Sequence, residues 1–153
     1  MIEDVKCAVR SLRAHAGEYN IDPDRLAAMG ASAGGHLVSL LGTRDQNAGF
    51  DVGEYLDQSS RVKAVIALAS VIDLTRNFPN ADIEMMKRIG LGKHNIVQAS
   101  PITYVMPDEP PFLLIHSNQD ELVPYEQSQL MYERLTQVGV HAQLCSSRTD
   151  GIA

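Results

Sequence analysis

The chain has 153 residues, 44% of them hydrophobic, and its 13 lysines and arginines against 19 aspartates and glutamates leave a formal net charge of -6. This length and composition predict one folded domain over residues 1–153 with a sizeable core. An acidic balance without a basic cluster argues against nucleic acid and anionic membranes as partners. No apolar run approaches the roughly 20 residues of a membrane span, and the lack of targeting signals predicts a cytoplasmic protein.

The first predicted element is an amphipathic helix over residues 2–17, because apolar side chains recur there at helical spacing. A signal peptide is excluded because three cations interrupt any apolar segment. The expected buried face of this helix consists of Val5, Ala8, Val9, Leu12 and Ala16.

A glycine-rich motif follows, between a predicted strand at residues 26–29 and a predicted helix at residues 35–42. Residues 30–34 read Gly-Ala-Ser-Ala-Gly and match the pattern G-x-S-x-G. The pattern by itself is weak, but a preceding strand and a following helix are the context that a nucleophile elbow requires.

This arrangement nominates Ser32 as a nucleophile, since a serine hydroxyl is reactive only when a sharp turn holds it, exposed, beside a general base. We expect Gly30 and Gly34 to prevent a collision between strand and helix. The N–H of Ala33 at the start of the helix would point toward a developing oxyanion.

The next predicted strands lie at residues 62–69 and at residues 112–115, where an apolar run has the form of a buried parallel strand. Asp120 follows the second of these at the rim where α/β sheets bind ligands. Asp73, after the first, is interpreted as a structural turn residue. A helix over residues 125–138 and a strand over residues 140–147 complete the predicted elements.

Two stretches carry a resemblance to a known family. Residues 22–37, Asp-Pro-Asp-Arg through the serine motif to Gly-His-Leu, and residues 110–124, from Pro-Pro-Phe-Leu-Leu-Ile-His to Leu-Val-Pro, resemble the α/β-hydrolase carboxylesterases of the hormone-sensitive-lipase-like and acetyl esterase group. The resemblance runs from about residue 4 to about residue 144. It implies an α/β fold of about four parallel strands with helices on both faces, and a serine esterase acting on small, short-chain esters. Ser32 would be its nucleophile and Asp120 its triad acid.

By the same resemblance, residues 74–106 correspond to a small cap near the site, with helical character at residues 83–89 and 100–104. Met85 and Met86 in this segment would line an acyl pocket, since methionine packs adaptably against irregular ligands. Ordinary packing is the alternative explanation for both.

The chain departs from the family at both ends. Residues 148–153, where the family carries its catalytic histidine, contain none, and the upstream His-Gly-Gly oxyanion loop is absent. The expectation is therefore the C-terminal half of an α/β-hydrolase, truncated at both ends or read from a shifted frame. An impaired fragment with a structural or interaction role is the alternative function.

Five histidines could replace the missing base. His116 is the first candidate because it ends the strand that leads to Asp120, although the family has a mainly structural histidine there. The family also carries the histidine at position 36 without using it as the base. His94 lies in the variable segment, and His15 and His141 are expected at the opposite edge of the sheet. A histidine from another subunit is also possible.

Neither a metal nor a nucleotide cofactor is expected, since no H-E-x-x-H, zinc-ligand spacing or G-x-G-x-x-G occurs. Cys7 and Cys145 are interpreted as small buried side chains, with no disulfide or catalytic role. In the complete fold the nucleophile strand is central, so here its outer edge would be open. We therefore expect a homo-oligomer or a domain-swapped dimer that covers this edge.

Overall fold

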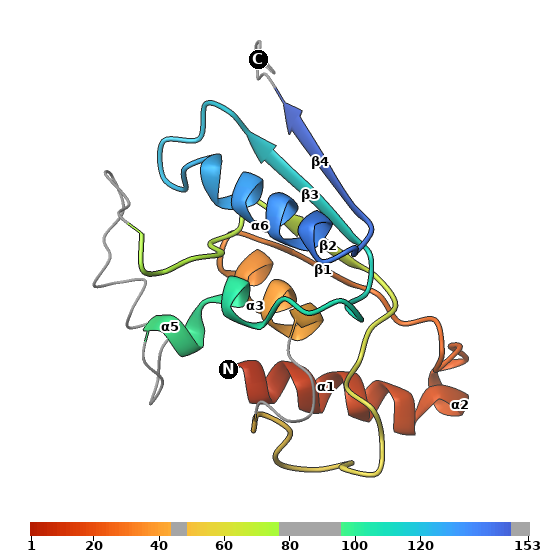
Figure 1. The fold of residues 1–153 in the computed structure, drawn as a ribbon. Coiled ribbons are helices and arrows are strands. Elements are labelled where there is room, and N and C mark those ends of the chain that lie inside the picture. Colours follow the sequence, from red (N-terminus) through yellow and green to blue (C-terminus); the bar gives the residue numbers. More distant parts are fainter. Residues whose placement is uncertain (44–48, 77–95, 148–153) are drawn as a thin grey trace.

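The computed structural model describes residues 1–43, 49–76 and 96–147. Within them, four parallel strands form one sheet in the order β1-β2-β3-β4 (Figure 1). The strands are β1 Ala28–Ala31, β2 Val65–Leu68, β3 Phe112–Ser117 and β4 Ala142–Ser147. Because all four run in the same direction, their carboxyl ends lie at one edge of the sheet, where the loops after β1, β2 and β3 meet. The prediction of an α/β fold with four parallel strands is confirmed.

The described helices connect these strands and precede them. They are α1 Ile2–Ala14, α2 Ala16–Tyr19, α3 Ala33–Thr43, α5 Ile96–Ala99, the 3-10 helix η2 Pro101–Tyr104, and α6 Glu126–Gln137. The first predicted helix is thus two helices with a break at His15. No described helix has both the length and the apolar character required to cross a membrane.

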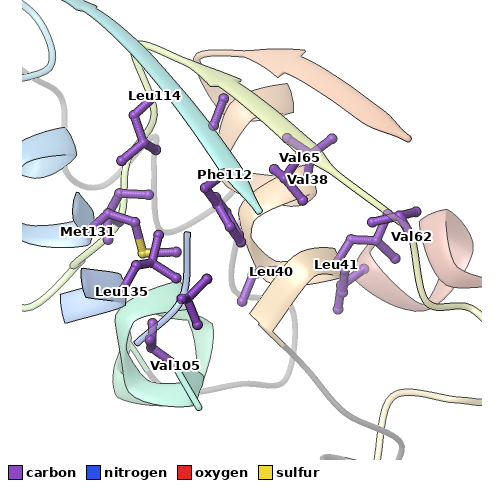
Figure 2. Packing of buried hydrophobic residues seen from close by; sticks show 14 of the residues in the cluster. Val38, Leu40, Leu41, Val62, Val65, Val105, Phe112, Leu114, Met131 and Leu135 are labelled. Carbon is purple, nitrogen blue, oxygen red and sulfur yellow. The ribbon is translucent and has the colours of Figure 1, made fainter. Parts of the chain in front are cut away.

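The core lies on one face of the sheet. Val65 and Leu114 are completely buried, and Phe112 lies between α3 and the α6 side chains Met131 and Leu135 (Figure 2). Burial of a large apolar side chain stabilises the fold by about 1.5–3 kcal/mol. This cluster therefore holds α3 and α6 on the sheet, and with them the loops at its carboxyl edge.

The expectation that helices cover both faces of the sheet is not met within the described residues. Helices α1, α3 and α6 lie on the same side (Figure 1). Strands that are consecutive in space and in sequence are joined by right-handed crossovers, and these place every connecting helix on one face. On the other face Met29 is 67% exposed, and the alternate residues Ile66 and Leu113 are only partly buried.

The buried face of α1 differs from the predicted one. Lys6 and Arg10 are each 1% exposed, whereas Leu12 is 43% exposed and Ala8 is exposed as well. The cause is the carboxylate of Asp51, which is distant in the sequence but adjacent in the fold. Lys6 Nζ lies 2.5 Å from Asp51 Oδ2, and one guanidinium nitrogen of Arg10 lies 2.8 Å from Asp51 Oδ1.

Further hydrogen bonds complete this cluster. Arg10 donates to the carbonyls of Glu54 and Val52, and the Ser60 hydroxyl donates to Asp51 Oδ1 at 2.8 Å. Burial by itself would raise the pKa of Asp51, but the hydrogen bonds from Lys6 and Ser60 and the charges of Lys6 and Arg10 outweigh it and lower that pKa below its usual value. The ion pairs bind α1 to residues 51–60.

Candidate active site

Ser32 lies at the sharp turn between the last residue of β1 and the first residue of α3. Its φ is 52°, a left-handed conformation that is uncommon and costly for a residue other than glycine. The Ser32 N–H donates to the Leu68 carbonyl at 2.8 Å, and the Ser32 carbonyl accepts the His36 N–H at 2.9 Å. The Ser32 side chain is exposed. The strand, the elbow and the helix thus occur in the predicted order around Ser32. The strand begins and ends two residues later than the predicted residues 26–29, and the helix begins two residues before the predicted residue 35.

The glycines around Ser32 have unequal roles. A Cβ on Gly30 would lie 2.4 Å from the Gly34 carbonyl oxygen, and one on Gly35 would lie 2.1 Å from the Ser70 hydroxyl. A Cβ on Gly34 would meet nothing within 4 Å. The expectation of a steric need at Gly34 is therefore wrong. The convergence of strand and helix requires glycine at position 30, and close packing of α3 on the loop after β2 requires it at position 35.

Ala33 is the first residue of α3 and is exposed. The N–H groups of a first helical turn have no acceptor within the helix and carry the positive end of its dipole. The Ala33 N–H therefore lies next to Ser32 with the polarity that an oxyanion requires.

Asp120 lies in the loop after β3, at the same edge of the sheet as Ser32. Its Oδ1 accepts the N–H groups of Leu122 and Val123, both at 2.9 Å. Its Oδ2 lies 3.4 Å from His116 Nε2, and the side chain is 21% exposed. These contacts fix the carboxylate in one orientation while a part of it still faces solvent.

His116 is buried, and both of its ring nitrogens have partners. Nε2 lies 2.9 Å from the Val123 carbonyl and Nδ1 lies 2.7 Å from the Ser128 hydroxyl. A carbonyl can only accept, so Nε2 carries the proton and Nδ1 accepts the Ser128 O–H in the neutral ring. This arrangement leaves no lone pair on His116 for a proton from Ser32, which argues against the expectation that His116 is the surrogate base.

The other predicted histidines are placed as follows. His36, on α3, contacts the Val71 carbonyl through Nδ1 at 2.8 Å. The His141 carbonyl accepts the N–H of Phe112, which places His141 at the amino edge of the sheet, opposite Ser32. His15 caps α1, where Nδ1 contacts the Ser11 carbonyl at 2.8 Å. His94, Met85 and Met86, with most of the expected cap, lie outside the described residues.

Two polar residues of α6 were missed by the sequence interpretation. Gln127 is 2% exposed and Ser128 is 0% exposed. Both are polar, and both find hydrogen-bond partners at the carboxyl edge of the sheet. The signal was present in the spacing, because Ser128 lies three and seven positions before the core residues Met131 and Leu135. A polar residue on the apolar face of a helix requires a hydrogen-bond partner.

No cluster of three or more histidine, cysteine, aspartate or glutamate side chains that could hold a metal ion occurs in the part of the chain that the structure describes. Cys7 and Cys145 are both free thiols. Cys145 is exposed, contrary to the expectation of burial, because it lies on the uncovered face of the edge strand β4.

The sheet is parallel, Ser32 lies at a strained turn between β1 and α3, and Asp120 follows β3, two strands later. This is the arrangement of an α/β-hydrolase. The family model described as BD-FAE matches residues 1–135. The chain belongs to this family of α/β-hydrolase carboxylesterases.

Individual proteins agree with this assignment. The probable carboxylic ester hydrolase LipM of Mycobacterium tuberculosis is 34% identical over 94% of this chain, and the esterase LipC of the same organism is 32% identical over 90%. Each match covers 36% of the relative, so the chain spans about a third of the length of these curated proteins.

Solved structures are similar as well. A truncated carbohydrate esterase from gut microbiota matches with a TM-score of 0.84 and 29% identity, over 95% of this chain and 58% of that one. A butyrate-bound thermophilic esterase of Thermogutta terrifontis matches with a TM-score of 0.77 and 27% identity, over 95% of this chain and 53% of that one.

Proposed function

We propose that the protein is a carboxylic ester hydrolase for short-chain esters in which Ser32 is the nucleophile. The observation that carries this proposal is the φ of 52° at Ser32, held between β1 and α3 in a chain of a carboxylesterase family. Backbone strain of this kind persists only where the surrounding structure maintains it, and it presents the hydroxyl above the sheet.

In the proposed reaction Ser32 Oγ attacks the ester carbonyl carbon and its proton passes to a histidine. The Ala33 N–H donates to the oxyanion, and collapse of the tetrahedral intermediate expels the alcohol, which takes the proton. Water then hydrolyses the acyl-enzyme by the same steps. Asp120 orients the histidine. Because both ring nitrogens of His116 are used by Ser128 and Val123, we infer that the base is a different histidine.

The substrate class rests on the relatives. Names of related proteins include a carboxylic ester hydrolase, esterases and a carbohydrate esterase, and one structure is described as butyrate-bound. A short acyl chain on a small alcohol or sugar is the substrate that suits them all. Met85 and Met86 as parts of an acyl pocket remain a proposal of the same kind.

The test is hydrolysis of p-nitrophenyl acetate and butyrate by the chain and by Ser32→Ala. Loss of a triad nucleophile costs on the order of 10⁶-fold in kcat, so the variant should show only the background rate. Intact-mass detection of a fluorophosphonate adduct checks the same hydroxyl without turnover. The matched control is Ser11→Ala, a serine of α1 far from the elbow, which should react as the parent does.

Equal rates for the parent and Ser32→Ala, with no adduct on either, would contradict the proposal. The alternative of an impaired α/β-hydrolase fragment with a structural or interaction role would then hold. The contacts of His116 favour that alternative, because they remove the first candidate for the general base.

We also infer that a second copy of the chain covers the outer edge of β1. In the described sheet this strand pairs only with β2, and Met29, a residue of the strand itself, is 67% exposed. An open apolar edge strand invites pairing with another chain. Sedimentation should therefore give a dimer or larger species, and Met29→Lys should shift it toward the monomer. A parent that sediments as a monomer at working concentration would contradict the inference.

A further inference from the structure

Three loops meet at the carboxyl edge of the sheet, and the middle one separates Ser32 from Asp120. In the strand order, β2 lies between β1, which leads to Ser32, and β3, which leads to Asp120. The first residue after β2, Ala69, has a φ of 45°, and its N–H donates to the Ile115 carbonyl of β3 at 2.9 Å. Residues 69–73 therefore lie between the candidate nucleophile and the candidate acid.

Buried side chains from two helices hold this middle loop. From α3, His36 contacts the Val71 carbonyl at 2.8 Å. From α6, Gln127 Oε1 accepts the N–H groups of Ile72 at 2.8 Å and Asp73 at 2.7 Å, and its Nε2 donates to the Asp73 carbonyl at 3.3 Å. One amide side chain thus satisfies three backbone groups in a region from which water is largely excluded.

The neighbouring residue of α6 holds the loop that carries the acid. The Ser128 hydroxyl donates to His116 Nδ1 at 2.7 Å, which leaves the proton of the neutral ring on Nε2. Nε2 donates to the Val123 carbonyl, and the Val123 N–H donates to Asp120 Oδ1. A continuous series of hydrogen bonds therefore runs from α6 to the carboxylate.

We propose that Gln127 and Ser128, adjacent in the first turn of α6, are positioning residues that together set the placement of the middle loop and of Asp120 relative to Ser32. Neither residue touches the reacting atoms. Both act through backbone groups, Gln127 on the loop after β2 and Ser128, through His116, on the loop after β3. The proposal rests on the proposed function, because it assigns these contacts a role in Ser32 reactivity.

The test begins with two local measurements that need no activity. Nitrogen-15 NMR of the His116 imidazole should find the proton on Nε2 in the parent. Loss of the Ser128 hydrogen bond in Ser128→Ala should shift the Nδ1 resonance, and Ser128→Thr should restore it. Amide exchange at Ile72 and Asp73 should be about tenfold faster in Gln127→Met, since loss of a buried hydrogen bond weakens local protection. Gln129→Met, the same change at an exposed position of α6, should leave that protection unchanged.

The functional measurement is the rate at which a fluorophosphonate labels Ser32, taken at a temperature where all variants are folded. Ser128→Ala and Gln127→Met should react about 10-fold to 100-fold more slowly than the parent, since small displacements remote from the chemistry have effects of this size. The threonine variant should recover the rate. Gln129→Met, the same change at an exposed position of α6, should match the parent.

Different results would overturn the positioning role, the hydrogen-bond series and the proposed function of Ser32. Local signals that change while labelling does not would overturn the positioning role. A His116 ring protonated on Nδ1 in the parent, or local signals that do not respond to any variant, would overturn the hydrogen-bond series itself. A parent that is never labelled at Ser32 would overturn the proposed function, and the positioning role with it, even if the local signals changed as expected.

Discussion

Replacement of Gly30 by alanine is expected to lower the free energy of unfolding by about 3 kcal/mol, the upper end of the usual cost of overpacking. The new Cβ would lie 2.4 Å from the Gly34 carbonyl oxygen and 2.9 Å from the Gly35 nitrogen. Both atoms belong to the backbone and cannot rotate away, so strand and helix must separate at the elbow. Urea unfolding measures the loss, and Ser32 labelling should fall with it.

The matched control is Gly34→Ala, in the second glycine of the same motif. An added Cβ there would meet nothing within 4 Å. Alanine is favoured over glycine in a helix by about 0.5–1 kcal/mol, so this variant should be as stable as the parent or slightly more stable. Equal destabilisation by the two substitutions would show that the close approach of β1 and α3 is not what requires glycine at position 30.

Replacement of Asp51 by asparagine is expected to cost about 3 kcal/mol, because removal of one partner from a buried ion pair leaves uncompensated charge. Lys6 and Arg10 are each 1% exposed and share this one carboxylate among the described ion pairs. Asp51 itself is 18% exposed, so the lower end of the range for buried pairs applies. Urea unfolding of the parent and the variant at pH 7 measures the difference.

The same pair of proteins provides a pH test. The pKa of Asp51 is lowered in the folded state, so the unfolded chain binds the proton more tightly. The advantage of the parent should therefore be complete above the unfolded value of about 3.9 and should shrink as the pH falls through the folded pKa. Asp108→Asn is the control, since the Arg61–Asp108 pair is exposed and should contribute at most about 1 kcal/mol. An Asp51→Asn deficit that persists unchanged at pH 3 would contradict the electrostatic explanation.

Much of the candidate active-site edge was predictable because its signals are local. The elbow at Ser32 lies within a five-residue pattern flanked by a strand and a helix, and Asp120 follows an apolar run that had to be a buried strand. Periodicity and turn chemistry depend on neighbours in the chain, so they can be interpreted without a structure. The same logic located β2, α6 and β4.

The role of each glycine could not be assigned in this way. The motif treats Gly30 and Gly34 alike, but only the path of the backbone reveals that the carbonyl of one occupies the space of a side chain on the other. The role of His116 was equally undetermined, because the sequence does not specify which atoms satisfy the two ring nitrogens.

Short local patterns were enough to predict the four strands, the elbow at Ser32, the loop of Asp120 and the resemblance to carboxylesterases. The shared face of the described helices became visible only in the packed fold, as did the pairing of Lys6 with Asp51 across 45 positions and the contact of Gln127 with Ile72 across 55. Secondary-structure propensity acts over a few residues, whereas a buried polar group takes its partner from whatever segment the packed fold brings beside it.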